Sequence, residues 1–388
     1  MESDLLILVV VSAVAAMYLL MVLYFFVYWL KQPHFVPSAK SKEVTVTIVV
    51  PVRNEEKNIR ACIEHLFNQN YPKHLYEVIV VDDYSIDDTR KIVRELNFPA
   101  LRLFDLQQYL SDRGEKKPNK KEAISIGIKN AQGDIIITTD GDCIRGENWL
   151  PTMVSFFVEN NYKLVTAPVL VKPAYTPLQL LQQADVMALM GITGATIAAG
   201  KPTMCSGANL MYAKETFREL EGFKGNNDVP SGDDIFLMQK VYEKYSNGIG
   251  FVKHFDAVVF TQPEKGLFNF FGQRIRWVSK SAGYAGWWVK LQLFFAYMFN
   301  LLVVGVVAFS IYGFVQTRQL TALLPGAIAL GTKLFSDFLF CVPIFSFFKK
   351  LWLLLLLPFL EILHIFYIVV IGLLSLSGRY RWRGRRVG

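Results

Sequence analysis

A charge-free run near the N-terminus sets the first limit on this fold. Residues 5–30, "LLILVVVSAVAAMYLLMVLYFFVYWL", carry no charged side chain, and roughly 20 apolar residues are enough to cross a bilayer. A cleaved signal peptide is the alternative, but its apolar core is shorter and follows a basic start. Here the start is the acidic "MESD", and Lys31 comes after the run. We therefore predict an uncleaved transmembrane anchor over residues 1–31, with "KQPHFVPSAKSK" on the cytoplasmic side.

More apolar stretches lie in the last third of the chain, near residues 291–315, 320–348 and 351–377. They help to raise the hydrophobic content to 52% and the mean hydropathy to +0.29. We predict a C-terminal transmembrane region over residues 291–377, followed by a basic tail over residues 378–388. Part of the net charge of +8 lies in that tail, so we interpret the charge as membrane contact and expect no nucleic-acid partner.

These spans conflict with the charge rule. With the middle of the chain in the cytoplasm, three further full crossings would place the arginine-rich tail outside. One stretch is therefore expected to be re-entrant or interfacial, and the middle one, which contains Lys333 and Asp337, is the candidate.

The cysteines suggest a reducing compartment. Their spacing supports neither a disulfide framework nor a zinc site; they are Cys62, Cys143, Cys205 and Cys341. We expect an integral, multi-pass protein of the plasma (inner) membrane with its middle domain in the cytoplasm.

Strand and helix patterns alternate through that middle domain. β-Branched runs at residues 44–51, 76–81 and 134–140 predict strands, the first of them stopped by Pro51, and a weaker strand is predicted near 100–106. Helical spacing follows Asn54, a candidate N-cap, and recurs near residues 85–96 and 119–132. This alternation predicts an α/β domain with a parallel-dominated sheet, whose ligands bind beyond the carboxyl ends of the strands.

Acidic residues follow two of the predicted strands. Asp82 and Asp83 end one strand, and Asp140 and Asp142 end "DIIITTDGD". In an extended chain, residues i and i+2 face the same way, so Asp140 and Asp142 can aim at one cation. Mg²⁺ and Mn²⁺ accept such oxygen ligands together with phosphate oxygens. A solvent-exposed turn is the alternative for this sequence.

Several motifs in order resemble the membrane-bound branch of the family 2 glycosyltransferases, which have the GT-A (nucleotide-diphospho-sugar transferase) fold. The similarity covers residues 44–280, and the motifs are "IVVPVRNEE", "VIVVDDYSIDDT", "NKKEA", "DGD", "CSGANLMY", "SGDDIFL" and "QRIRW". Asn119 departs from the glycine common before the lysine, and Cys143 replaces a small polar residue.

This resemblance implies roles for individual residues. A nucleotide-sugar donor, expected to be a UDP-sugar, is bound by Pro51, Arg53, Glu55, Asp82, Asp83, Lys120, Asp140, Gln273 and Arg276. Asp140 and Asp142 hold Mg²⁺ or Mn²⁺, and a lipid or glycan acceptor meets Gly207, Asn209 and Trp277. An interfacial membrane anchor is the alternative role for Trp277.

The chemical step needs a base. Asp233 and Asp234 begin an amphipathic helix, where acids also stabilise the helix N-terminus. By resemblance, Asp234 is the general base of an inverting transfer, and Asp233 orients or binds.

The resemblance favours one arrangement and leaves alternatives open. We predict a cytoplasmic GT-A domain over residues 44–265, flanked by N- and C-terminal transmembrane helices, with interfacial amphipathic helices over 266–290. The function is then sugar transfer to a lipid or lipid-linked acceptor, and the alternative is a processive β-polysaccharide synthase. A dehalogenase-type phosphatase or a non-catalytic membrane scaffold or transporter would need a different use of these acids, and nucleotide-sugar turnover separates all three classes.

Overall fold

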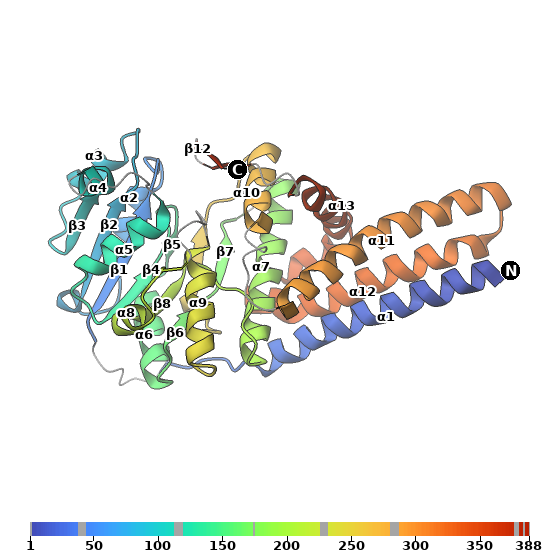
Figure 1. The fold of residues 1–388 in the computed structure, drawn as a ribbon, viewed down its shortest axis with the longest axis horizontal. Coiled ribbons are helices and arrows are strands. Elements are labelled where there is room, and N and C mark those ends of the chain that lie inside the picture. The colour runs from blue at the N-terminus through green and yellow to red at the C-terminus, as the bar shows by residue number, and fades with distance from the viewer. Residues whose placement is uncertain are drawn as a thin grey trace. The chain divides into compact units, whose positions relative to one another are not determined.

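The computed structural model describes residues 2–37, 44–111, 119–173, 175–225, 232–279, 287–375, 380–382 and 385–387. Predicted features in the gaps lie outside the described residues; they include part of the linker after the first span, Ser231 and the arginine side chains of the tail. The described chain divides into two compact units (Figure 1). The sheet unit comprises Gln32–Pro173 and Thr196–Pro263, and the helical unit comprises Met1–Lys31, Ala174–Ala195 and Glu264–Gly388.

A seven-stranded sheet forms the centre of the sheet unit, with strand order β3-β2-β1-β4-β8-β6-β9. The first four strands of this order are parallel, β8 is antiparallel to both of its neighbours, and β6 and β9 are parallel. The parallel-dominated sheet of a GT-A-like α/β domain is thereby confirmed. The strands are β1 (Val46–Val52), β2 (Tyr76–Asp82), β3 (Leu101–Asp105), β4 (Ile135–Thr138), β6 (Leu164–Thr166), β8 (Leu210–Ala213) and β9 (Ile249–Phe251).

A smaller sheet, in the order β5-β10-β7, joins distant segments of the same unit. Its strands are β5 (Ile144–Arg145), β7 (Val169–Val171) and β10 (Val259–Thr261). The helices of the sheet unit are α2 (Ile59–Phe67), α3 (Thr89–Glu95), α4 (Leu106–Ser111), α5 (Lys120–Asn130), α6 (Trp149–Glu159), α8 (Lys214–Glu219) and α9 (Asp233–Lys244).

Strand β1 continues past the point where the sequence predicted its end. Pro51 lies inside β1 and pairs in register with Val81 of β2. A proline is tolerated here because β4 pairs with β1 only through Val49, so Pro51 has a strand neighbour on one side alone. The prediction that Pro51 stops the strand was therefore wrong.

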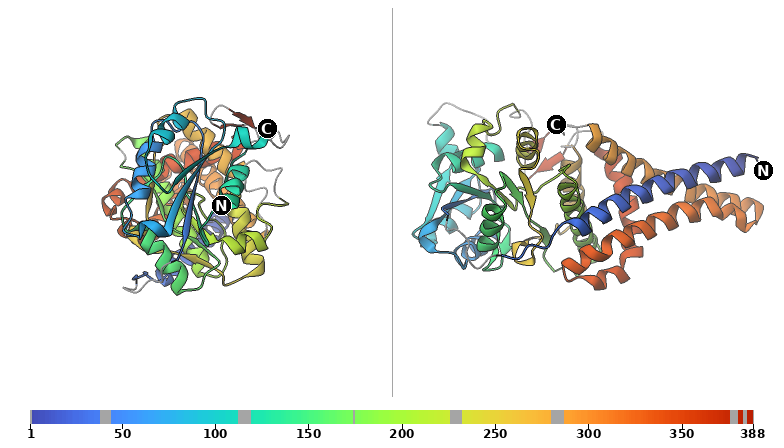
Figure 2. Two further views of the ribbon diagram at one scale, coloured as in Figure 1. Left: turned by 90° about the vertical axis from the view of Figure 1, so that its left-hand side faces the viewer. Right: turned by 90° about the horizontal axis from the view of Figure 1, so that it is seen from below.

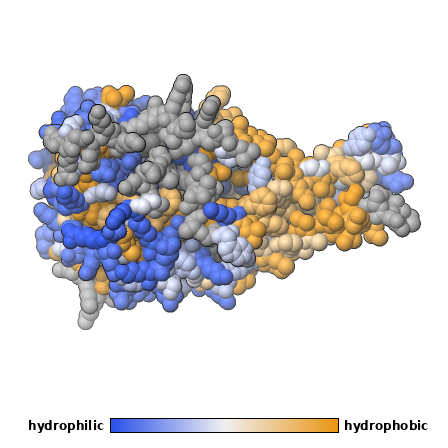
Figure 3. All heavy atoms as spheres, viewed as in Figure 1, coloured by the Kyte–Doolittle hydropathy of each residue, from blue (hydrophilic) through white to orange (hydrophobic). Residues whose placement is uncertain are grey.

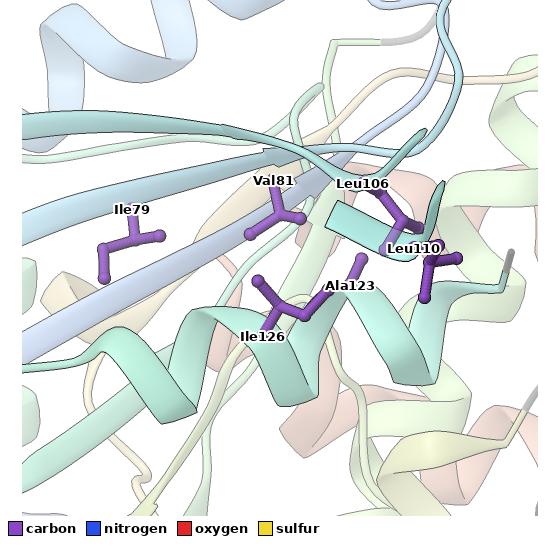
Figure 4. Close-up of a cluster of buried hydrophobic side chains, with 6 residues drawn as sticks. All are labelled: Ile79, Val81, Leu106, Leu110, Ala123 and Ile126. Atoms are coloured by element: carbon purple, nitrogen blue, oxygen red, sulfur yellow. The ribbon is translucent and has the colours of Figure 1, made fainter. Parts of the chain in front are cut away.

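One face of the sheet packs against α4 and α5. A buried cluster joins these helices to β2 (Figure 4) and consists of Ile79, Val81, Leu106, Leu110, Ala123 and Ile126. Helix α5 also approaches β1 closely, because a Cβ on Gly127 would meet Val49 Cγ1 at 2.4 Å. The side chain of Asn119 caps α5 by accepting a hydrogen bond from the Glu122 N–H at 2.9 Å.

Three long helices of the helical unit lie side by side (Figures 1 and 2). They are α1 (Glu2–Lys31), α11 (Trp287–Thr317) and α12 (Leu324–Phe347), and apolar residues dominate their visible surface (Figure 3). Helices α1 and α12 run parallel, since Tyr18 OH donates to Asp337 Oδ1 at 2.7 Å and the rings of Trp29 and Phe347 lie 5.7 Å apart further along.

The remaining helices of this unit are α7 (Pro177–Ala198, up to Ala195), α10 (Leu267–Ser279) and α13 (Leu357–Ser375), and the tail contains β11 (Tyr380–Trp382) and β12 (Arg385–Val387). Helix α13 packs on α10, where the rings of Tyr367 and Phe270 lie 5.2 Å apart. Among the described residues, four helices are long and apolar enough to cross a membrane: α1, α11, α12 with the turn before it, and α13.

Candidate active site

The carboxyl ends of β1, β2 and β4 meet at one edge of the sheet. From β1 the chain adds β2 and β3 on one side, and then returns to add β4 on the other side of β1. This change of direction makes the boundary between β1 and β4 a topological switch point, where α/β sheets bind ligands. The strands end at Val52, Asp82 and Thr138, so the predicted acids lie at or just beyond this edge.

The loops that follow β1 and β2 are tied together. The N–H of Asn54 donates to Ser85 Oγ at 2.9 Å, and Asn54 Oδ1 accepts from the Ile86 N–H at 3.0 Å. Asn54 adopts a left-handed φ of 54°, so its predicted role as a helix cap was wrong. Arg53 Nη1 donates to the carbonyl oxygen of Asp83 at 2.8 Å. The predicted donor-binding residues of the two loops therefore form one structure.

Asp82 lies at the end of β2 and is fully buried. Its Oδ2 accepts from the Ser85 N–H at 3.1 Å, and Arg90 Nε lies 3.7 Å away. Burial raises the pKa of Asp82, although the Ser85 hydrogen bonds and the Arg90 charge oppose the rise. Asp82 Oδ1 has no hydrogen-bond partner among the described residues. A buried acceptor of this kind is usually satisfied by a donor group, which a bound ligand can supply.

The two metal-binding candidates lie in a turn after β4, and the prediction that they extend the strand was wrong. Strand β4 ends at Thr138, and the Cys143 N–H donates to the carbonyl oxygen of Asp140 at 3.2 Å. Gly141 fits this turn because a Cβ there would meet Val52 Cγ1 at 2.8 Å. The short turn returns the chain at once to β5 and keeps both carboxylates beyond the end of β4.

Two residues that sequence reasoning missed support this turn. Thr261 Oγ1 donates to Asp142 Oδ2 at 3.2 Å. Arg145 is buried and donates from Nη2 to Thr139 Oγ1 at 3.1 Å and to the carbonyl oxygen of Cys143 at 2.9 Å. A basic residue so close to "DGD" was a signal that the sequence offered. Thr261 lies 119 positions from Asp142 and offered none.

Lys120 connects Asp140, one of the metal-binding candidates, to Asp233 at the start of the helix that carries the candidate base. Its Nζ lies 2.8 Å from Asp140 Oδ1 and 3.9 Å from Asp233 Oδ2. Burial alone would lower the pKa of Lys120, but the charges of Asp140 and Asp233 raise it above its ordinary value. The ammonium group therefore stays charged between two acids that lie on different elements.

Asp233 and Asp234 begin helix α9, as the sequence predicted. Gly232 precedes them with a left-handed φ of 90°, which glycine adopts at low cost. Asp234 Oδ2 accepts from the Gly207 N–H at 3.0 Å, and Asp234 Oδ1 accepts from the Ile235 N–H at 2.9 Å. Each carboxylate oxygen has a second lone pair, so Asp234 is held in place and can still accept a proton.

The donor set at this sheet edge suits a hard cation that is shared with a ligand. Among the described residues, no three His, Cys, Asp or Glu side chains gather as a metal site. Asp140 and Asp142 would supply two carboxylates, and phosphate oxygens and water would complete the shell. Mg²⁺ is usually bound in this way, through one or two carboxylates and substrate phosphates.

Two predicted acceptor residues, Gly207 and Asn209, lie in the loop before β8. Asn209 is fully buried, and its amide donates to the carbonyl oxygens of Pro168 at 2.9 Å and Ala257 at 2.8 Å. Its Oδ1 accepts from Trp149 Nε1 at 3.0 Å. These bonds commit the Asn209 side chain to the fold. The predicted acceptor contact at Gly207, whose N–H donates to Asp234, stays a prediction.

The "QRIRW" residues lie on α10 in the helical unit, whereas the acids described above belong to the sheet unit. Gln273 Nε2 donates to Glu264 Oε1 at 3.2 Å, and the ring of Trp277 lies 4.2 Å from the guanidinium carbon of Arg274. The donor and acceptor roles of Gln273, Arg276 and Trp277 remain predictions.

Comparison with known proteins agrees with this geometry. The model for "Glycosyl transferase family 2" matches residues 47–221, which include the loops, the DGD turn and the Gly207 loop. Residues 47–221 of this chain are therefore similar to the family 2 glycosyltransferases. The mannosyltransferase PcManGT of Pyrobaculum calidifontis, solved with GDP-Man and Mn²⁺, has a similar fold. Its TM-score is 0.59 at 19% identity, over 95% of this chain and 99% of that one.

Curated glycosyltransferases and a synthase match over shorter regions. Glycosyltransferase AglE of Haloferax volcanii is 34% identical over 110 residues, which are 28% of this chain and 34% of the relative. A dolichyl N-acetyl-α-D-glucosaminyl phosphate glucuronosyltransferase of Methanococcus voltae is 36% identical over 96 residues, 24% of this chain and 27% of the relative. Dodecaprenyl-phosphate galacturonate synthase of Rhizobium johnstonii is 33% identical over 120 residues, 29% and 32% of the two chains. The matched regions thus span about a third of these relatives or less.

Proposed function

We propose that this chain is an inverting, metal-dependent family 2 glycosyltransferase that moves a sugar from a nucleoside-diphosphate sugar to a lipid or lipid-linked acceptor at the membrane. The contact between Lys120, Asp140 and Asp233 supports this proposal most directly. It brings Asp140 and the start of the candidate base helix together at the sheet edge where ligands bind.

The donor site is argued from the loops after β1 and β2. The unpartnered Oδ1 of Asp82 suits a ribose hydroxyl or a base N–H group. The charged Lys120 suits a diphosphate. Asp140 and Asp142 would hold Mg²⁺ or Mn²⁺, which neutralises charge on a departing diphosphate. A UDP-sugar remains the expected donor, and the nucleotide base is part of the proposal.

We assign the role of general base in the chemical step to Asp234. Its carboxylate takes the proton of the acceptor hydroxyl as that oxygen bonds to the anomeric carbon and the carbon–oxygen bond to the nucleotide breaks. The hydrogen bonds from the Gly207 and Ile235 N–H groups orient this carboxylate. A single displacement of this kind inverts the anomeric configuration, so an α-linked donor gives a β-linked product.

A lipid-linked acceptor suits the four candidate membrane helices and the polyprenyl-phosphate chemistry in the names of two relatives. The purified full chain should be incubated with Mn²⁺, a panel of nucleotide sugars and polyprenyl-phosphate or glycolipid acceptors, and its products analysed by mass spectrometry. We expect a lipid that gains one sugar in β linkage. A long polymer would favour a processive synthase, and no transfer from any nucleotide sugar would contradict the proposal.

A further inference from the structure

A buried ion pair joins two helices of the helical unit. Arg274 of α10 and Asp185 of α7 lie 2.7 Å apart, and their side chains are 5% and 9% exposed. The sequence motifs assign no role to either residue, since Arg274 lies between Gln273 and Arg276 in "QRIRW". Breaking a buried pair by removing one partner leaves an uncompensated charge, so both residues are constrained together.

A second contact holds the start of the α10 segment to the same helix. Gln182 Nε2 donates to the carbonyl oxygen of Glu264 at 3.0 Å, and the Glu264 N–H donates back to Gln182 Oε1 at 2.9 Å. Gln182 and Asp185 lie three residues apart and therefore on one face of α7. This face of α7 contacts α10 at Arg274 and the chain just before α10 at Glu264.

Arg274 in turn contacts Trp277. The guanidinium carbon lies 4.2 Å from the centre of the Trp277 ring and 5.0 Å from that of Phe270. A cation over an aromatic face is attracted to it, more strongly where water is excluded. The carboxylate of Asp185 thus fixes the group against which the indole of Trp277 packs.

We propose that Asp185 is a positioning residue that sets the orientation of Trp277 through Arg274. The inference rests on the proposed function only in giving Trp277 a place at the acceptor. With Asp185 intact, charge attraction keeps the guanidinium beside α7, where the indole packs against it; the contact has the geometry of an ion pair and not of a hydrogen bond. Without that carboxylate, Arg274 loses its anionic partner on α7, and the indole loses its fixed neighbour.

Asp337 provides a matched control. It is also a carboxylate paired with a cation in the helical unit, here Lys333, which is buried and also lies 2.9 Å from Glu361 Oε2. Its ion pair lies on α12 and not on α10, and His364, which is 3.6 Å from Glu361 Oε2 and 3.8 Å from Asp185 Oδ1, lies between the two clusters. The control therefore also tests whether a change in the neighbouring cluster reaches Trp277. Asp337→Asn therefore reproduces the loss of an intramolecular ion pair, while Lys333 keeps Glu361 as a partner.

The first readout is independent of activity. The full chain is labelled with 5-fluorotryptophan, and the Trp277 signal is identified by its loss in Trp277→Phe. We expect this signal to shift in Asp185→Asn and to stay in place in Asp337→Asn. An unchanged Trp277 signal in Asp185→Asn would overturn the proposal, whether or not the protein transfers sugar.

The second readout separates positioning from stability. Asp185→Asn should raise the acceptor KM about tenfold and leave nucleotide affinity unchanged. The double variant Asp185→Asn, Arg274→Gln removes both charges, so its Tm should recover while the KM stays high. Recovery of KM together with Tm would mean a structural role only and would overturn the proposal. If the unaltered protein transfers no sugar at all, the proposed function fails, and the fluorine signal still tests the positioning.

Discussion

At the residue scale, the two carboxylates of the DGD turn have different supports. Asp140 pairs with Lys120, whereas Asp142 accepts from Thr261. We predict that EDTA abolishes sugar transfer, that Mn²⁺ restores it, and that Asp142→Ala cannot be restored. Thr261→Val keeps the shape but removes the donor to Asp142, so it should weaken Mn²⁺ affinity about tenfold, as loss of a residue behind a metal ligand does. Calorimetric titration of Mn²⁺ with the nucleotide measures this, and full activity in EDTA would refute metal dependence.

Asp234 leads to a different prediction, because in the proposed mechanism it takes a proton and binds no donor. Asp234→Asn keeps its size but cannot act as a base, so turnover should fall by about 10²–10⁴-fold while nucleotide affinity is retained. Asp140→Asn should weaken both. Glu243→Gln, an exposed change on the same helix α9, is the control and should behave as wild type. Near-normal turnover in Asp234→Asn, or an α-linked product from an α-linked donor, would mean that the base or the mechanism is misassigned.

Lys253 links stability to pH. It is 3% exposed, donates from Nζ to the carbonyl oxygen of Gln32 at 3.0 Å, and burial lowers its pKa to about 8. Between pH 8 and its ordinary pKa of about 10.4, the unfolded chain binds the proton more tightly, so stability rises with pH in this window.

Relative to Lys253→Met, the wild-type sheet unit should therefore gain about 2–3 kcal/mol from pH 8 to pH 10.4, with little further change below pH 8. Thermal unfolding of both proteins across this range measures the difference. The exposed substitution Lys91→Met should follow the wild-type curve, and a difference that does not vary with pH would contradict the assignment.

At the element scale, the packing of α5 on β1 controls the position of Lys120, which begins α5. Gly127→Ala would place a Cβ 2.4 Å from Val49 Cγ1. Overpacking costs about 1–3 kcal/mol, partly offset by the roughly 1 kcal/mol by which alanine favours a helix. Val49→Ala removes the clashing methyl groups, so the two changes should be non-additive: the double variant should be more stable than the sum of the single changes predicts. A double-mutant cycle from unfolding curves tests this, and simple additivity would mean that the backbone yields instead.

The same scale shows what the sequence could predict. Local patterns located strands β1 to β4 and helices α2, α3 and α5, because buried β-branched runs and helical spacing depend only on neighbours in the chain. They also predicted Asp233 and Asp234 at the start of α9. They failed where a turn depends on distant packing: Gly141 lies against Val52, and Asn54 bonds to the Ser85 loop. No local pattern contains the hydrogen bonds from the Asn209 amide to the carbonyl oxygens of Pro168 and Ala257. The same is true of the contacts that place α7 in the helical unit.

At the scale of the whole molecule, the parallel course of α1 and α12 revises the expected topology. The parallel helices α1 and α12, with α11 leading into α12, suit three full crossings. We therefore interpret α12, which was the re-entrant candidate, as a full span. Helix α13 is then the stretch that does not cross fully in our interpretation. Glu361, near its start, meets Lys333 in the middle of α12, whereas Gly372, near its end, lies against Tyr297 in the first half of α11. Both the sheet unit and the C-terminus would lie on the cytoplasmic side, in accord with the basic tail.

Reporter cysteines test this topology. The native cysteines are all buried, so their silence towards a reagent says nothing about sidedness. We predict that an impermeant maleimide added to intact cells labels Gln319→Cys, in the turn between α11 and α12, and misses the exposed Lys57→Cys and a cysteine added to the C-terminus. All three should react after the cells are opened. Labelling of the C-terminal cysteine from outside would restore α13 as a full crossing.

The hydrogen bond between Tyr18 and Asp337 has a consequence for biosynthesis, because 319 positions separate its partners. At about 5–20 residues per second, the ribosome needs roughly 15–60 s to make the second partner after the first. During this interval the Tyr18 phenol of α1 lacks its Asp337 partner, and by its end all strands of the central sheet, which lie between residues 46 and 251, have been made. The sheet unit can thus fold before α12 completes the bundle. A chaperone or insertase that shields α1 would have to hold it for that whole interval.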